Sequence, residues 1–281
     1  MEFLLCYPFF RKKAVTFSYD DGVIQDREVI KILKAHSLKG TFNLNYGMSG
    51  KPKLRKDIHG IDIDCSHLVL EDSVSLYEGM EIANHTLTHP HLEGMDSSLQ
   101  MDEFVKGKRK LEELFHREVY GAAYPYGTYD KTTLDLEKSL GVEYARTTRS
   151  TYDFSLPYNW LLWNPTIHHR DKRMKETLMR FVSSERELAL LYIWGHGYEF
   201  AIDRNFDLLD DICTTLNEHQ EDIICLTNHE IYTYVNAACS VYYSRLEKAF
   251  VNPSGCDVYL ICDGNRIVVP KKGLYRYENA E

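Results

Sequence analysis

The sequence predicts an α/β protein: a distorted (β/α) barrel of seven or eight strands with a small C-terminal β appendage. Short β-branched or aromatic runs alternate with longer amphipathic stretches over about 225 residues, a pattern typical of a mostly parallel sheet covered by helices. Seven or eight such units that close on themselves match this length. With 281 residues, 44% of them hydrophobic, the chain is long enough to bury a large core.

The elements follow one another in a regular order. A first strand is expected at residues 14–19, and residues 24–36 follow as a helix with its apolar side chains on one face. Further strands are expected at residues 41–45, 81–84, 119–124, 142–147, 164–168, 188–194 and 223–227. Further helices are expected at residues 97–115, 131–140, 174–183 and 206–220, the first of them capped by Asp96 or Ser97. Residues 48–75 are expected to form a long loop with little regular structure.

Beyond Ala238 the alternation of strands and helices stops. Two apolar runs, residues 256–262 and 266–269, flank an Asp-Gly turn and predict a β-hairpin. We therefore expect a barrel over residues 1–238 and a small β appendage over residues 239–281.

Charge and apolar content argue against two classes of partner. Lys and Arg number 33 against 42 Asp and Glu, a net charge of -9, whereas a general nucleic-acid binder needs a basic surface. The apolar run at residues 3–10 is far shorter than the ~20 residues that span a bilayer, and it lacks the features of a signal peptide. The seven cysteines are scattered without a C-x-x-C pair. We expect no nucleic-acid or membrane partner and a cytoplasmic location.

Two adjacent carboxylates, Asp20 and Asp21, end the first predicted strand. In a (β/α) barrel, active sites lie at the C-terminal ends of the strands. An acidic turn in which one Asp caps the following helix is the alternative interpretation of this segment taken alone.

Three histidines also follow predicted strands. His85 and His89 lie four residues apart, a spacing that puts two imidazoles on one face of a helical turn and lets them bind one metal ion. Such a pair also arises by chance among 12 histidines. Two imidazoles and one carboxylate leave an open position on a divalent cation, as catalytic sites do, and a second carboxylate could accept a proton from water there. His196, flanked by two glycines, follows another strand, with a simple glycine turn as its alternative interpretation.

In motif order and spacing, roughly residues 12–238 resemble the polysaccharide deacetylases, the NodB-homology carbohydrate esterases of family 4. The first motif of that family implies a catalytic base at Asp20 and a metal ligand at Asp21. Its second motif, H-[ST]-x-x-H, implies metal ligands at His85 and His89. The late histidine that acts as general acid corresponds to His196. The family fold is a distorted (β/α) barrel, in agreement with the strand count.

The third motif of the family resembles residues 123–127, which implies that the backbone N–H of Tyr126 helps to hold the oxyanion. Trp194 lies where the family builds part of its substrate groove. The chain departs from the family pattern at Ala123, where an arginine is usual, and in a degenerate fourth motif at residues 151–160. His168 and His169 could supply the missing support for Asp20 and His196, or they could form an exposed pair in a turn.

The resemblance implies a metal-dependent hydrolase that removes N-linked acetyl groups from an amino sugar or from its oligo- or polysaccharide. It would bind one divalent ion, for which zinc suits the ligands and Co²⁺, Ni²⁺ and Fe²⁺ are possible. Two alternatives remain at this stage: a metal-dependent hydrolase of a small non-sugar amide, such as a ureide or cyclic imide, and a catalytically silent carbohydrate-binding protein. A closed pocket would favour the small amide, and an open groove would favour the sugar polymer.

Overall fold

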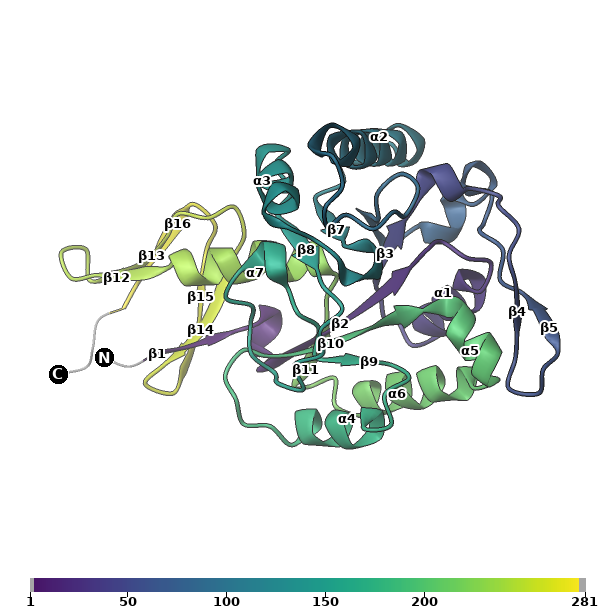
Figure 1. Ribbon diagram of the computed structural model, residues 1–281. Coiled ribbons are helices and arrows are strands. Elements are labelled where there is room, and N and C mark those ends of the chain that lie inside the picture. Colours follow the sequence, from purple (N-terminus) through teal and green to yellow (C-terminus); the bar gives the residue numbers. More distant parts are fainter. Residues whose placement is uncertain (1–2, 278–281) are drawn as a thin grey trace.

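The centre of the protein is a sheet of eight parallel strands, seen in a computed structural model that describes residues 3–277 (Figure 1). The strand order is β8-β7-β6-β3-β2-β10-β9, and β11 pairs with the first half of β2. The strands are β2 (Lys13–Asp20), β3 (Thr41–Leu44), β6 (Glu81–Asn84), β7 (Gly121–Ala123), β8 (Tyr144–Arg146), β9 (Ile167–His168), β10 (Ala189–His196) and β11 (Ile223–Cys225). Every residue of β2 is buried, as expected for a parallel strand covered on both faces.

The two edges of this sheet are joined by the segment that leads into β9. Trp163 forms a parallel bridge with Arg146 of β8, with hydrogen bonds of 2.9 Å from its N–H to Ala145 O and 3.0 Å from Thr147 N–H to its carbonyl oxygen. Three residues later, the N–H of Thr166 donates to Tyr192 O of β10 at 3.0 Å. The sheet is therefore curled into a distorted barrel, which confirms the predicted fold class.

Seven α-helices accompany the strands in the described part of the chain. They are α1 (Asp26–Ala35), α2 (Ser97–Phe115), α3 (Lys131–Ser139), α4 (Met174–Val182), α5 (Gly197–Asp203), α6 (Phe206–Glu218) and α7 (Asn228–Ser240). Helix α2 has the predicted bounds, and the side chain of Asp96 accepts a hydrogen bond from Ser98 N–H at its start. The sequence did not predict α5 and α7, although both begin with a capping box, that of α7 formed by Thr227 and Glu230.

The expectation of an irregular loop over residues 48–75 is wrong in part. This segment contains an antiparallel hairpin of β4 (Leu54–Lys56) and β5 (Asp62–Asp64), at the right of Figure 1. Short 3-10 turns flank it at η2 (Tyr46–Met48), η3 (Leu70–Asp72) and η4 (Val74–Tyr77). The hairpin has only three residues per strand and is held by contacts with distant segments, so the local pattern of apolar residues does not reveal it.

The remaining strands form two small antiparallel sheets at one end of the molecule. One sheet has the order β1 (Phe3–Cys6), β14 (Val258–Cys262) and β15 (Asn265–Val269), and the other β12 (Tyr242–Ser244), β13 (Ala249–Asn252) and β16 (Gly273–Arg276). The hairpin β14–β15 turns at Asp263 and Gly264, both with positive φ (48° and 79°), as a two-residue hairpin turn requires. The sequence did not predict β1, which brings the N-terminal end into this appendage; the boundary at residue 238 stays a prediction.

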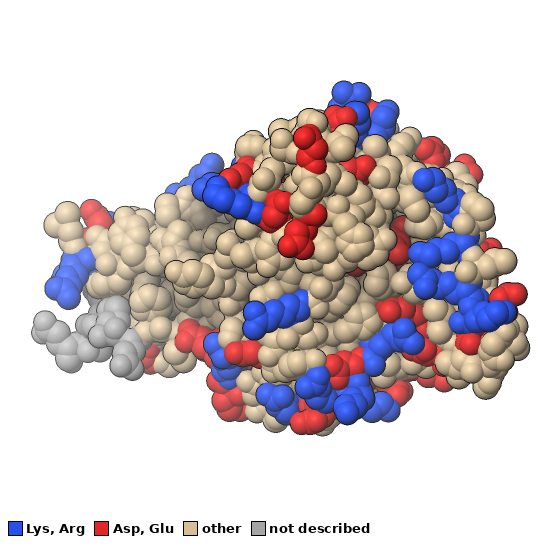
Figure 2. All heavy atoms as spheres, viewed as in Figure 1, with Lys and Arg blue, Asp and Glu red and all other residues tan. Residues whose placement is uncertain are grey.

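Three further 3-10 turns complete the described chain: η1 (Pro8–Phe10), η5 (Pro125–Gly127) and η6 (Trp160–Leu162). Among the described residues, no helix combines the length and the apolar character needed to cross a membrane. On the face shown in Figure 2, acidic and basic side chains mix along the lower edge, and Lys and Arg gather at the right, where Figure 1 places β4 and β5.

The contact between β7 and β8 leaves no room for a side chain at Gly121. A Cβ atom there would lie 1.9 Å from Cζ of Tyr144, its fully buried register partner. We expect Gly121→Ala to lower the free energy of unfolding by about 1–3 kcal/mol through overpacking, measured by urea denaturation. Gly255→Ala is the control, because no atom lies within 4 Å of the position that a Cβ would take there. Equal stability of the two variants would contradict this packing.

Candidate active site

The predicted functional residues gather at the carboxyl ends of the parallel strands. Asp20 ends β2, His85 follows β6 directly, and His196 ends β10. A cavity of about 440 Å³ opens at this end of the barrel. Seven of the nine predicted residues line it: Asp20, Asp21, His85, His89, Tyr126, Trp194 and His196.

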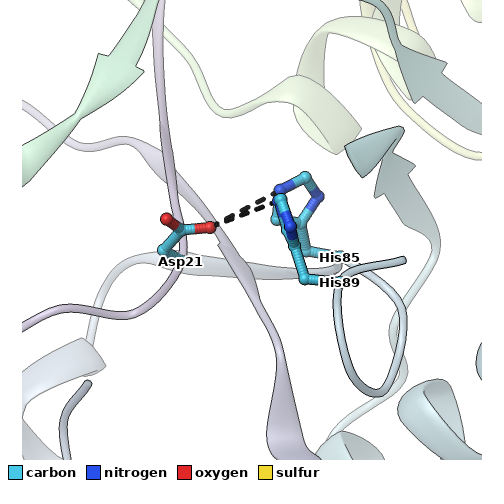
Figure 3. A group of neighbouring side chains, drawn as sticks. All are labelled: Asp21, His85 and His89. Carbon is cyan, nitrogen blue, oxygen red and sulfur yellow. Dashed lines mark ion pairs between the residues drawn. The ribbon is translucent and has the colours of Figure 1, made fainter. Parts of the chain in front are cut away.

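Asp21, His85 and His89 point toward one another (Figure 3). The Oδ1 atom of Asp21 lies 3.8 Å from Nε2 of His85 and 3.6 Å from Nε2 of His89. Two ligand bonds of ~2.0–2.2 Å that meet at a tetrahedral angle put their donor atoms roughly 3.3–3.6 Å apart. The donor chemistry and the spacing therefore fit a divalent metal ion.

The histidines converge through a turn and not through the helical turn that their spacing suggested. Residues 85–90 have no helix, and Thr86 and His89 have positive φ values of 64° and 62°. Asp21 also has a positive φ, 78°. Such conformations cost about 1–3 kcal/mol each for residues other than glycine, and they cluster at functional sites. Here they turn the chain just beyond two strand ends, where the three side chains meet.

The surroundings of the two imidazoles favour the neutral form, in which one ring nitrogen keeps a free lone pair. His85 Nδ1 lies 2.7 Å from the carbonyl oxygen of Ala123, so that nitrogen carries the proton and Nε2 keeps a lone pair facing Asp21. Burial lowers the pKa of His85, and burial together with the neighbouring His85 lowers the pKa of His89 to about 4. Metal ligation requires neutral histidines.

Asp20 is paired with an arginine that the sequence motifs did not indicate. Nη2 of Arg146 donates to Oδ1 and Oδ2 of Asp20 at 2.7 and 2.5 Å, and Nδ2 of Asn43 donates to Oδ1 at 2.8 Å. Asp20 and Arg146 are both almost completely buried. Burial alone would raise the pKa of Asp20, but Arg146 and the nearby histidines outweigh it and lower that pKa.

Arg146 also explains the absent arginine at Ala123. The two residues are register partners on the neighbouring strands β7 and β8, so the guanidinium comes from the next strand. It lies 4.4 Å from the centre of the Trp194 ring, which lines the same cavity. The signal in the sequence was a charged residue near the end of a predicted barrel strand.

Glu199 supports His196 and is a second residue that the sequence motifs did not indicate. Oε2 of Glu199 lies 3.2 Å from Nδ1 of His196 and accepts a 2.9 Å hydrogen bond from its backbone N–H. Burial works to lower the pKa of His196, but Glu199 together with Asp20 and Asp21 raises it. The G-H-G-x-E sequence at a strand end, with the Glu at the third helical position, was the available signal.

His168 and His169 reach His196 through Glu199. Their Nε2 atoms lie 3.2 and 3.4 Å from the same Oε2 atom. Gly195 makes room for this arrangement, because a Cβ there would lie 2.1 Å from Nδ1 of His169. Among the described residues, neither histidine forms an ion pair with Asp20, so the support expected for Asp20 comes from Arg146 instead.

Tyr126 presents an exposed ring at the mouth of the cavity. Its φ is 56°, its side chain is 58% exposed, and its ring stacks on that of His91 at a centroid distance of 3.9 Å. An edge contact at 4.5 Å joins it to the ring of His89. The flat face of an aromatic ring beside Asp21, His85 and His89 suits an amphipathic ligand.

Comparison with known proteins gives a family match. Residues 10–145 match the sequence model of the family described as polysaccharide deacetylase. YxkH of Bacillus subtilis, named as a candidate polysaccharide deacetylase, is 27% identical over 139 residues. This match covers 49% of the chain and 45% of YxkH, so it spans less than half the length of that curated relative.

Solved structures share the fold at low sequence identity. A candidate polysaccharide deacetylase from Mycobacterium smegmatis has a TM-score of 0.61 and 15% identity, over 83% of this chain and 93% of that chain. A pseudoenzyme of carbohydrate esterase family 4 from Bacillus anthracis has a TM-score of 0.51 and 16% identity, over 80% of this chain and 66% of that chain. At these identities the likeness shows the barrel fold alone.

The buried pair of Asp20 and Arg146 gives a stability prediction. Arg146→Met leaves the Asp20 carboxylate buried without its cation, and we expect a loss of about 3–5 kcal/mol in the free energy of unfolding. Adding Asp20→Asn to Arg146→Met removes the uncompensated charge and should return most of that loss. Chemical denaturation of the two single variants and the double variant measures this coupling. A double variant as unstable as the sum of the singles would show that the two side chains are not coupled.

Proposed function

We propose that this chain is a metal-dependent hydrolase that removes N-linked acetyl groups from an amino sugar or its oligo- or polysaccharide, because its residues 10–145 match the polysaccharide deacetylase family. The observation that carries the proposal is the convergence of five side chains from three strand ends on one cavity: Asp20, Asp21, His85, His89 and His196. Two carboxylates and three imidazoles supply a ligand set, a base and an acid within one site.

Asp21, His85 and His89 would hold one divalent cation. Two imidazoles and a carboxylate suit zinc, and Co²⁺, Ni²⁺ and Fe²⁺ accept the same ligands. When bound, such an ion supplies Lewis acidity, which lowers the pKa of water and stabilises negative charge on an acyl oxygen.

Asp20 would accept the proton of the water that attacks the acetyl carbonyl carbon. Its Oδ2 atom lies 3.9 Å from Nε2 of His85 and 4.0 Å from Nε2 of His196, so it faces the ligands and the acid. The lowered pKa keeps this carboxylate ionised, and Arg146 and Asn43 hold it in one orientation. Orientation of a general base matters because proton transfer needs hydrogen-bond contact with the reacting water.

His196 would give its proton to the departing amine nitrogen. Its raised pKa favours the imidazolium form, while Asp20 is kept as a carboxylate. Environments that drive the pKa values of two neighbouring groups apart assign the acid and the base. The backbone N–H of Tyr126 would help to hold the oxyanion, and the ring of Tyr126 and the Trp194 side chain would contact the sugar.

The first test separates metal binding from proton transfer. We expect the purified protein to bind one divalent ion and to release acetate from N-acetylated sugar oligomers, and we expect chelation to abolish that activity. His89→Ala should lose the metal, because it removes a ligand. Asp20→Asn should keep the metal and lose about 10²–10⁴-fold in kcat, because it removes the proton acceptor and leaves the three ligands in place.

Metal content and acetate release, measured on the same samples, check these expectations. Metal loss in Asp20→Asn would show that Asp20 is the metal ligand and would leave Asp21 as the candidate base. A metal-loaded wild-type protein that binds these sugars but releases no acetate would instead support a catalytically silent carbohydrate-binding protein.

The second test concerns the acid. An alkyl amine leaves poorly without a proton, whereas an activated phenolate needs none. His196→Ala should therefore lower amide cleavage about 10²–10⁴-fold and hydrolysis of p-nitrophenyl acetate by less than about tenfold. Glu199→Gln should also lower amide cleavage more than ester hydrolysis, but by smaller factors. It destabilises the imidazolium form of His196 without removing the imidazole. Equal losses on both substrates, with folding and metal content unchanged, would leave His196 without the acid role.

A further inference from the structure

Two basic side chains, Lys53 and Arg55, line the same cavity as the metal-ligand cluster. They belong to the β4 side of the hairpin, where alternate residues face opposite sides. Lys53 and Arg55 are half-buried toward the cavity, whereas Leu54 and Lys56 are exposed. The group of Lys and Arg side chains at the right of Figure 2 covers the side of the molecule where this hairpin lies.

Both cations are held over an aromatic ring and are not neutralised. The guanidinium of Arg55 lies 4.3 Å from the centre of the Tyr198 ring, and Nζ of Lys53 lies 5.5 Å from it. Within residues 3–277 neither side chain forms an ion pair; the hairpin's ion pairs belong to Lys56 and Asp57. Nε of Arg55 is buried and has no hydrogen-bond acceptor among the described residues.

The hairpin is fixed at both ends, so these cations are preorganised. At its base, the N–H of Leu68 donates to Gly22 O at 2.8 Å and the N–H of Ile24 donates to Ser66 O at 2.9 Å, directly after the Asp20 and Asp21 pair. At its tip, Asp57 forms an ion pair with Arg204 (Nη2 to Oδ2, 2.6 Å) at the end of α5. Binding to a fixed site avoids the entropy cost of ordering a loop.

The positive charges of Lys53 and Arg55 are not offset by the other charged groups of the cavity. Arg146 offsets Asp20, and the proposed divalent ion would more than offset Asp21. Lys53 and Arg55 then remain as two unpaired cations in a chain whose net charge is -9. Cations held without partners beside a substrate cavity are suited to bind an anionic group.

We propose that Lys53 and Arg55 form an anion subsite, which binds a carboxylate or phosphate group carried by the substrate near its acetamido group. The substrate class is then an acidic N-acetylated amino sugar and not a neutral one. This inference rests on the proposed function, since it concerns a second part of the same substrate.

The experiment compares three sugars that share the acetamido group. They are neutral N-acetylglucosamine, N-acetylmuramic acid with its carboxylate, and N-acetylglucosamine 6-phosphate. Binding is measured by calorimetry on the metal-loaded Asp20→Asn protein, and kcat/KM for acetate release is measured on the wild type. We expect at least one acidic sugar to bind about tenfold or more tightly than the neutral one, because hydrogen bonds to charged groups are the stronger kind.

The double variant Lys53→Gln/Arg55→Gln, in the same Asp20→Asn background, should bring the ratio of acidic to neutral affinity close to one. Lys56→Gln is the matched control: it removes a charge from the same strand, but its side chain is exposed, pairs with Asp62 and does not line the cavity. It should leave the ratio unchanged. Arg55→Lys should keep part of the preference, because the charge remains while the planar fork is lost. Comparison of N-acetylmuramic acid with N-acetylglucosamine 6-phosphate shows whether the subsite binds a carboxylate or a phosphate.

A wild-type preference for the neutral sugar, or a ratio that the double variant does not change, would overturn the anion subsite. Either result leaves the proposed function standing if acetate is released from a neutral N-acetylglucosamine tetramer. Conversely, a protein that releases no acetate from any of these sugars but binds the acidic ones through Lys53 and Arg55 would refute the proposed function and keep the subsite.

Discussion

Two adjacent carboxylates, buried at the end of β2, impose the constraint on which the rest of the site depends. Ionised groups are costly to bury unless each is paired or binds a metal. Asp20 is 2% exposed and Asp21 is 7% exposed, so each needs its own compensation. The chain turns at Asp21, whose φ is 78°, and this separates the two surroundings. One carboxylate meets a guanidinium and an amide, and the other meets two neutral imidazoles, so the first is held as a charge and the second is free to act as a ligand.

The same compensation extends to the histidine at the end of β10. Glu199 is 7% exposed, and burial alone would raise its pKa, but its contacts with His168 and His196 lower it strongly. An ionised Glu199 in turn favours the protonated form of His196. The proposed base and the proposed acid therefore depend on two separate partners, Arg146 and Glu199, that lie on different elements. Removing either partner should disturb one proton-transfer group and leave the other in place.

The parts of the protein that depend on local pattern could be predicted from its sequence. The bounds of α2 and the strand ends that carry Asp20 and His196 follow from periodicity. The grouping of Asp21 with the two histidines follows from the resemblance to the motifs of the polysaccharide deacetylases. Arg146 could not be assigned in this way, because its contact with Asp20 joins residues 126 positions apart and depends on the register of β8. The β4–β5 hairpin was missed for the same reason, since its supports lie beside residue 22 and in α5.

The strand ends and the hairpin contribute different kinds of side chains to the cavity, and this difference has a physical reason. Groups that move protons must be held closely, and the barrel strands supply that rigidity through hydrogen bonds on both sides. Selectivity needs a surface that can differ between relatives without disturbing the core, and a connecting segment between two strands meets that need. The β4–β5 hairpin lies in the connection between β3 and β6, yet it is anchored to Gly22 and Ile24, just beyond the two carboxylates, and to the helix that carries Glu199. In the proposed mechanism, a cation on this hairpin would therefore orient a distant part of the substrate relative to Asp20 and His196 without contacting either residue.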